Sequence, residues 1–93
     1  MKAEELERLA ILAEECAEVQ QIAMKIIRHG YESVHPDDPA LTANRQLLEK
    51  ELGDLLFAFN FMVEKRDIDK SNVMLHRDSK RKKIQRYLHH NEV

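Results

Sequence analysis

The sequence predicts an all-α protein with three main helices. Three observations support this fold class: the chain has only two Gly and two Pro among 93 residues, it is rich in Leu, Glu, Lys and Ala, and its apolar residues recur at helical spacing. A chain of this length is expected to form one domain, residues 1–93. So short a chain buries little core, so we expect a helical bundle completed by homo-oligomerisation, as a homodimer or homotetramer.

The first helix is expected to run from Ala3 to about His29. This stretch contains no Gly or Pro, and Gly30 is suited to the position that follows a helix. Its predicted core face consists of Leu9, Leu12, Cys16, Val19, Ala23, Ile26 and Ile27. Glu15 lies at the edge of that face and Glu18 just beyond it, whereas Glu14 points toward the polar side.

Residues 30–43 are expected to form a loop or to contain a short extra turn, opened by Asp38 and Pro39. A second helix follows, from about Asn44 to Lys65. Its apolar stripe consists of Leu47, Leu48, Leu55, Ala58, Phe59 and Met62, and its polar face carries Gln46, Glu49, Lys50, Gly53 and Asn60. Glu51 falls inside the stripe and Asp54 at its margin. An unpaired buried charge costs several kcal/mol, so these acids require basic partners, a proton or a metal ion.

A third helix is expected to begin after Asp69 or Ser71 and to reach about His89. Its stripe contains Val73, Arg77, Lys80, Ile84, Tyr87 and Leu88. Arg77 and Lys80 are therefore expected to point inward. Residues 64–90 hold nine basic and four acidic residues, while residues 1–20 hold six acidic and two basic ones. A basic segment is compatible with nucleic acid, with a solvated helix face or with a phosphate-binding wall. Bases that point inward are not part of a binding surface, which disfavours nucleic acid as a partner. A basic nucleic-acid binder is nevertheless kept as a third competing function.

Two acids from each of two helices form the predicted site. The pairs Glu15–Glu18 and Glu51–Asp54 each have a spacing of three residues, which places both carboxylates on one helix face. Four converging carboxylates repel one another unless a cation is present. Hard divalent ions such as Mg²⁺ bind through a few carboxylates together with substrate phosphates. The constellation therefore favours Mg²⁺, or Mn²⁺, and a phosphorylated substrate.

These residues resemble a known family. Glu14-Glu15-Cys16-Ala17-Glu18, followed by Glu51-Leu52-Gly53-Asp54, is similar to the EExxE…ExxD signature of the MazG-like, all-α nucleoside triphosphate pyrophosphohydrolases. The basic segment from Lys80 to Tyr87 resembles the family's basic segment, and the likeness covers essentially the whole chain. The resemblance implies cleavage of a nucleoside triphosphate between its α- and β-phosphates, giving a monophosphate and pyrophosphate. It also implies a dimer or a pair of dimers.

The resemblance further implies roles for individual residues. Glu15, Glu18, Glu51 and Asp54 would be the metal ligands, and Glu14 would be a catalytic acid that orients or activates the attacking water. Lys80 with Lys83 would neutralise the triphosphate, and Lys25 is another candidate for this role. The chain departs from the family in its long spacer, residues 19–50, and in Ile11, which stands where many relatives carry Lys.

Two other functions compete with this interpretation. One is a phosphoribosyl-ATP pyrophosphatase-like enzyme, whose relatives share the helical scaffold and the acidic motifs but have shorter spacers. The other is a non-catalytic helical interaction module held by buried ion pairs. The lone cysteine and the absence of a signal-like or membrane-spanning apolar segment predict a cytoplasmic protein without a membrane partner.

Overall fold

The computed structural model describes residues 1–93 and contains three α-helices and one short 3₁₀ turn. Helix α1 spans Ala3–His29, α2 spans Asn44–Glu64, α3 spans Lys70–Ile84, and the 3₁₀ turn η1 spans Gln85–Tyr87. The all-α prediction is confirmed, and the predicted limits of α1 and α2 agree to within a residue. The third helix is shorter than expected, because its last predicted turns become η1 and an irregular tail. None of the helices combines the length and the apolar character needed to cross a bilayer.

Side chains close to each helix start satisfy backbone groups that the helix leaves free. The Glu5 carboxylate accepts a hydrogen bond from the backbone N–H of Lys2 at 3.1 Å, before α1. Before α2, the side-chain oxygen of Gln46 accepts a hydrogen bond from the backbone N–H of Ala43 at 2.9 Å. Asp69 accepts from the Ser71 backbone N–H at 2.8 Å and thereby caps α3. The predicted cap at Asp69 is confirmed.

Helix α1 ends at Gly30, where the chain turns back. Gly30 has φ +91°, a conformation that favours glycine, and its N–H donates to the Ile26 carbonyl at 2.7 Å. In the following loop, the Asp38 carboxylate accepts from the N–H groups of Ala40 and Thr42, at 2.9 and 2.8 Å. Asp38 therefore caps a turn within this loop, as predicted, although the turn does not become a helix; the 3₁₀ turn η1 lies further along the chain.

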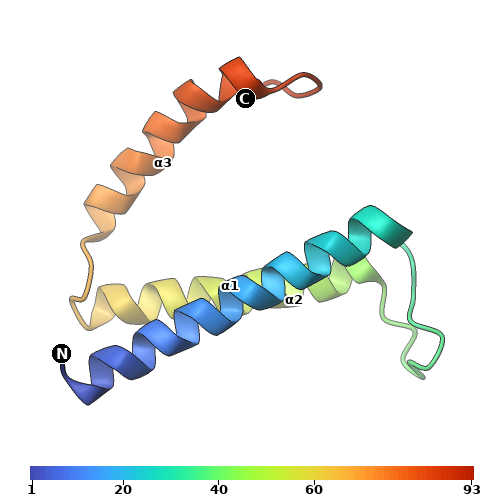
Figure 1. The fold of residues 1–93 in the computed structure, drawn as a ribbon, viewed down its shortest axis with the longest axis horizontal. Coiled ribbons are helices and arrows are strands. Elements are labelled where there is room, and N and C mark those ends of the chain that lie inside the picture. Colours follow the sequence, from blue (N-terminus) through green and yellow to red (C-terminus); the bar gives the residue numbers. More distant parts are fainter.

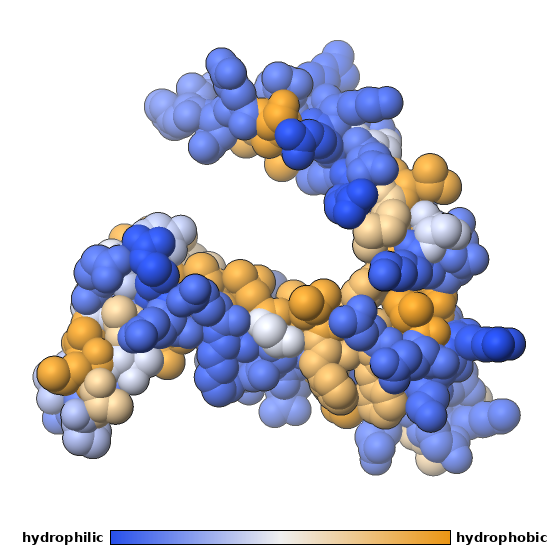
Figure 2. Space-filling view, turned by 180° about the vertical axis from the view of Figure 1, so that it is seen from behind, coloured by the Kyte–Doolittle hydropathy of each residue, from blue (hydrophilic) through white to orange (hydrophobic).

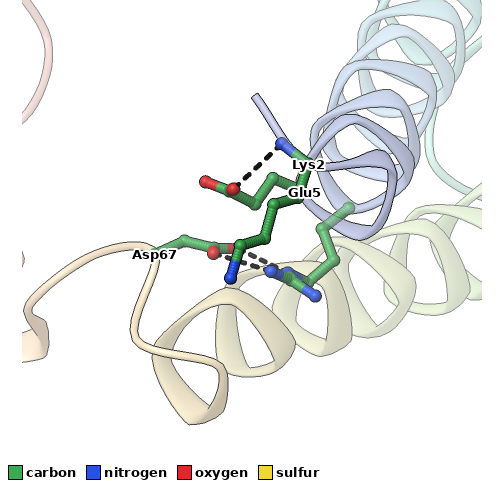
Figure 3. A network of polar contacts seen from close by, with 4 residues as sticks. Lys2, Glu5 and Asp67 are labelled. Carbon is green, nitrogen blue, oxygen red and sulfur yellow. Dashed lines mark hydrogen bonds and ion pairs between the residues drawn. The ribbon is translucent and has the colours of Figure 1, made fainter.

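Helices α1 and α2 form an antiparallel hairpin, and α3 leaves it at an angle (Figure 1). The three buried apolar residues, Ile22, Ala58 and Met62, all belong to the hairpin. The stripe predicted for α2 is confirmed, because Ala58 and Met62 are buried and its other members are half-buried. The connection from α2 to α3 is tied to α1 by a bidentate ion pair between Arg8 and Asp67, with nitrogen–oxygen distances of 2.5 and 2.8 Å. This ion pair lies next to the Lys2–Glu5 contact (Figure 3).

The face predicted for α1 is only partly correct. Leu9, Cys16, Ala23 and Ile27 are exposed, and Cys16 is not a core residue in this chain. The residues that meet α2 lie on a neighbouring strip that runs through Glu15 and the buried Ile22. One partner helix covers only a narrow strip, whereas the apolar side of α1 is broad. The outer part of that side therefore has no cover within the chain.

Candidate metal centre

Four carboxylates meet halfway along the hairpin. Glu15 and Glu18 come from α1, and Glu51 and Asp54 come from α2; one oxygen from each lies within 4.8 Å of the others. Each pair has the three-residue spacing that places both side chains on one helix face, and the two helices run antiparallel with these faces toward each other. All four residues are half-buried. The structure thus brings together the four acids that the sequence analysis selected.

The carboxylate cluster, defined as Glu15, Glu18, Glu51 and Asp54, is short of positive charge and of hydrogen-bond donors. Buried oxygens Oε2 of Glu15 and Oε2 of Glu51 have no hydrogen-bond partner. Burial, followed by the negative charges of Asp54 and Glu51, raises the pKa of Glu15. The Glu51 carboxylate, through hydrogen bonding and charge, raises the pKa of Glu18. Unpartnered buried carboxylate oxygens are costly, and a hard divalent cation is the ligand that suits them. The residues present therefore fit Mg²⁺ or Mn²⁺.

Lys50 partly compensates this negative charge. Its Nζ lies 2.8 Å from Oδ2 of Asp54 and 3.6 Å from Oε1 of Glu51. The Lys50 side chain is 63% exposed, so its contact with Asp54 is a surface ion pair of the i,i+4 type. Lys50 was predicted to lie on the polar face of the helix, with no part in the site. The four-residue spacing from Lys50 to Asp54 is the signal that could have revealed the contact.

The cluster opens into a cavity of 770 Å³ beside the second half of α1. Glu18 and Glu51 lie in its wall, and so do the basic residues Lys25 and Arg28. Lys25 was predicted to bind substrate, whereas Arg28 was given no individual role in the site. The cavity therefore joins a carboxylate cluster to two positive charges, as a site for a metal-bound polyphosphate requires.

Comparison with known families agrees with this geometry. The profile of the MazG nucleotide pyrophosphohydrolase domain matches residues 3–90. The chain belongs to the MazG family. Searches of curated proteins and of solved structures returned no match. The resemblance described from the paired acidic motifs is therefore confirmed at the level of the family.

Glu14 lies outside the carboxylate cluster of this MazG domain. Its side chain is exposed, as predicted, and Glu14 is not among the four acids whose oxygens lie within 4.8 Å of one another. Its charge is nevertheless among the causes that raise the pKa values of Glu15 and Glu18. Glu14 is thus a neighbour of the cluster on its solvent side.

The basic residues of α3 do not reach the carboxylates of their own MazG domain. Lys80 and Lys83 are exposed, and α3 stands away from the hairpin (Figure 1). Arg77 was expected to point inward but is also exposed and pairs with its neighbour Asp78 at 3.0 Å. The expectation that Arg77 and Lys80 point inward is wrong within one chain, because no element of that chain packs against their side of α3.

Proposed function

We propose that this protein is a Mg²⁺-dependent pyrophosphohydrolase that converts a ribo- or deoxyribonucleoside triphosphate to the monophosphate and pyrophosphate. The observation that carries the proposal is the carboxylate cluster, in which four acids from two helices converge and two buried oxygens lack partners. Membership of the MazG family supports the same reaction class. Mg²⁺ is the assigned ion, and Mn²⁺ is an acceptable substitute because it takes the same oxygen ligands.

Glu15, Glu18, Glu51 and Asp54 would hold the metal. When bound, the ion supplies charge neutralisation at the phosphoryl oxygens and a more acidic water. Lys25 and Arg28 lie in the wall of the adjoining cavity, and we assign them to oxygens of the α-phosphate, on the nucleoside side of the bond that breaks. Glu14, at the solvent side of the cluster, is assigned to orient the water that adds to the α-phosphorus while pyrophosphate leaves. The half-buried position of the cluster limits the access of other water molecules.

We assign Lys80 and Lys83 to the cluster of a neighbouring subunit. The protein chain is open, with extents of 43 × 38 × 16 Å and a radius of gyration of 16.4 Å, whereas a compact chain of this size has about 13 Å. Apolar side chains gather along the hairpin edge and at the corner between α2 and α3 (Figure 2). A homodimer or homotetramer would cover these side chains and bring a basic α3 toward an acidic cluster.

The direct test is a panel of canonical and modified nucleoside triphosphates with Mg²⁺ and separate detection of pyrophosphate and orthophosphate. We expect pyrophosphate and monophosphate from at least one substrate, and release of orthophosphate with diphosphate would contradict the reaction.

Asp54→Asn should abolish turnover and reduce the increase in melting temperature that Mg²⁺ gives the wild type. In chelator its melting temperature should stay within about 5 °C of the wild type, because its partner Lys50 is exposed. A larger loss would indicate a structural ion pair instead of a metal ligand.

Mixed subunits test the assignment of Lys80. Lys80→Ala should weaken triphosphate binding and spare Mg²⁺ binding, whereas Lys82→Ala, on the same helix, serves as the matched control. If the site is shared between subunits, mixing inactive Asp54→Asn protein with Lys80→Ala protein should restore part of the activity. In a mixed oligomer, some sites combine the intact carboxylates of a Lys80→Ala subunit with the intact Lys80 of an Asp54→Asn subunit. A mixture that stays inactive after subunit exchange has been verified contradicts the shared site.

A further inference from the structure

A second cavity lies at the end of the hairpin where α1 turns into α2. Its volume is 290 Å³, close to the lower limit of cavities that hold small ligands. The last turns of α1 supply Lys25 and His29, the loop supplies Ser33 and His35, and α2 supplies Asn44. None of these residues belongs to the carboxylate cluster.

The two cavities share Lys25. Glu18, Lys25 and His29 lie on one strip of α1, because they are separated by seven and four residues. At 1.5 Å per residue, Lys25 lies about 10 Å and His29 about 16 Å along the helix from Glu18. A nucleotide whose α-phosphate is held at the cluster would therefore extend its nucleoside part toward the second cavity.

The walls of this cavity are fixed by the fold of the loop. Asn44 is buried, with 3% exposure, and its Nδ2 donates to the Gly30 carbonyl at 3.1 Å. The Asn44 backbone N–H donates to the Ser33 carbonyl at 2.9 Å, and Val34 forms an isolated β-bridge with Ala43. A cavity held in this way binds a ligand without first having to order the loop.

The charged group of the lining, Lys25, is a donor and no carboxylate is present, although the Ser33 hydroxyl and the Asn44 side-chain oxygen can also accept. Lys25 can only donate hydrogen bonds. Nδ1 of His35 accepts from the Asp37 backbone N–H at 3.1 Å, which places the proton of the neutral imidazole on Nε2 and makes Nε2 a donor. No Asp or Glu lines the cavity. Such a lining suits carbonyl oxygens of a ligand better than amino groups.

We infer that the second cavity binds the base of the nucleotide and favours a base with a carbonyl oxygen over one with an amino group at the same position. Uracil should be favoured over cytosine, and hypoxanthine over adenine, because in each pair a carbonyl oxygen replaces an amino group, while the neighbouring ring nitrogen gains a proton. This inference rests on the proposed function, since that function places the α-phosphate at the carboxylate cluster. Ser33 and His35 are the residues assigned to base selection.

The test is calorimetric binding of four monophosphates in the presence of Mg²⁺, namely UMP against CMP and IMP against AMP. We expect the two carbonyl bases to bind about tenfold more tightly, a difference of about 1.4 kcal/mol. His35→Asn keeps an acceptor for the Asp37 N–H but removes the Nε2 donor, so the preference should fall to less than about threefold. Ser33→Ala should also reduce the preference. It should leave the loop intact, because the loop contact of Ser33 is made by its backbone carbonyl, which accepts from the Asn44 N–H, and the substitution removes only the hydroxyl. His76→Asn, on α3, is the matched control and should change nothing.

The outcomes of these measurements distinguish a failure of the base-binding inference from a failure of the proposed hydrolysis. Equal binding of the paired bases, no binding of any monophosphate, or a preference that survives both substitutions would overturn the inference. If the wild type hydrolyses triphosphates without such a preference, the proposed function stands and the assignment of the base fails. If it binds UMP and IMP preferentially but hydrolyses no triphosphate, the base pocket stands and the proposed function fails.

Discussion

Lys50 is the cation in direct contact with the carboxylate cluster, and its position has a consequence for metal binding. Its ammonium group lies 2.8 Å from Asp54 and 3.6 Å from Glu51, so it is attracted by the same oxygens that would bind a divalent ion. The pKa of Lys50 is raised, mainly by its hydrogen bond with Asp54 and then by the charges of Asp54 and Glu51. Lys50 and a metal ion should therefore oppose each other at this site.

Lys50→Met is expected to strengthen Mg²⁺ binding. Removal of a positive charge a few ångströms from a divalent ion lowers the repulsion by about 2 kcal/mol in a water-like environment, which corresponds to a roughly thirtyfold higher affinity, and salt reduces this gain. Titration calorimetry with Mg²⁺ and Mn²⁺ measures the change, and Lys82→Met is the control at a distant exposed position. Weaker Mg²⁺ binding by Lys50→Met would show that Lys50 positions the carboxylates instead of competing for them.

The hairpin of α1 and α2 depends on a small set of buried side chains. Met62 is 5% exposed and lies on the face of α2 that meets α1, whereas Met24 is 50% exposed on α1. Met62→Ala should reduce the free energy of unfolding by about 2–4 kcal/mol through lost contacts and a residual cavity. Met24→Ala should change it by less than about 0.5 kcal/mol. Urea unfolding of both variants checks the contrast, and similar losses would show that the buried face has been assigned incorrectly.

The connection from α2 to α3 is tied to α1 by the ion pair of Arg8 with Asp67. The side chains are 11% and 13% exposed, and the guanidinium of Arg8 holds the pKa of Asp67 below its ordinary value. As the pH falls toward 3, the unfolded chain takes up a proton at Asp67 while the folded chain does not. The ion pair therefore contributes stability above the ordinary pKa, near 3.9, and this contribution is lost progressively as the pH drops below it.

Asp67→Asn should remove this part of the acid sensitivity. The wild type is expected to lose more stability between pH 5 and pH 3 than Asp67→Asn, although the variant is less stable at pH 7. Chemical unfolding at several pH values gives the two slopes, and Glu7→Gln, at an exposed position of α1, controls for the loss of one negative charge. Parallel slopes for the wild type and Asp67→Asn would contradict the assigned pKa shift.

The molecule as a whole leaves much apolar surface uncovered. Ile27, Leu56, Phe57 and Leu75 are each more than half exposed, and Phe57 stacks only on Phe61, with ring centroids 5.5 Å apart. Single exposed apolar residues are ordinary, but such residues on all three helices of one short chain indicate a missing partner. A second copy of the chain is the partner that we assign to this surface, and the assignment stays a prediction.

Self-association should be visible at micromolar concentration. Analytical ultracentrifugation is expected to give a dimer or tetramer, and Phe57→Glu should shift the equilibrium toward monomer because it places a charge on the surface assigned to the interface. Lys65→Glu, at the exposed end of α2, is a control for charge alone. A wild-type protein that stays monomeric and stable on dilution would contradict both the assembly and the shared site.

The order of residues along the chain determined the helices and much of the candidate site. Helix limits follow from local features: Gly30 ends α1, Asp69 begins α3, and the absence of Gly and Pro keeps α1 continuous. The pairing of Glu15 with Glu18 and of Glu51 with Asp54 is equally local, because a three-residue spacing fixes a shared face. These properties need no knowledge of what packs against each helix.

Only the tertiary structure decided which face of each helix is covered. The apolar side of α1 is broader than the strip that α2 covers, so the residue pattern could not show that Glu15 would lie in the contact and Cys16 outside it. The direction of α3, and hence the separation of Lys80 from the carboxylates of its own chain, depends on the turn at residues 65–69 and on the Arg8–Asp67 ion pair. The second cavity has the same origin, since Lys25, Ser33 and Asn44 become neighbours only when the hairpin closes. Periodicity describes one helix at a time, whereas these contacts depend on the relative placement of several elements.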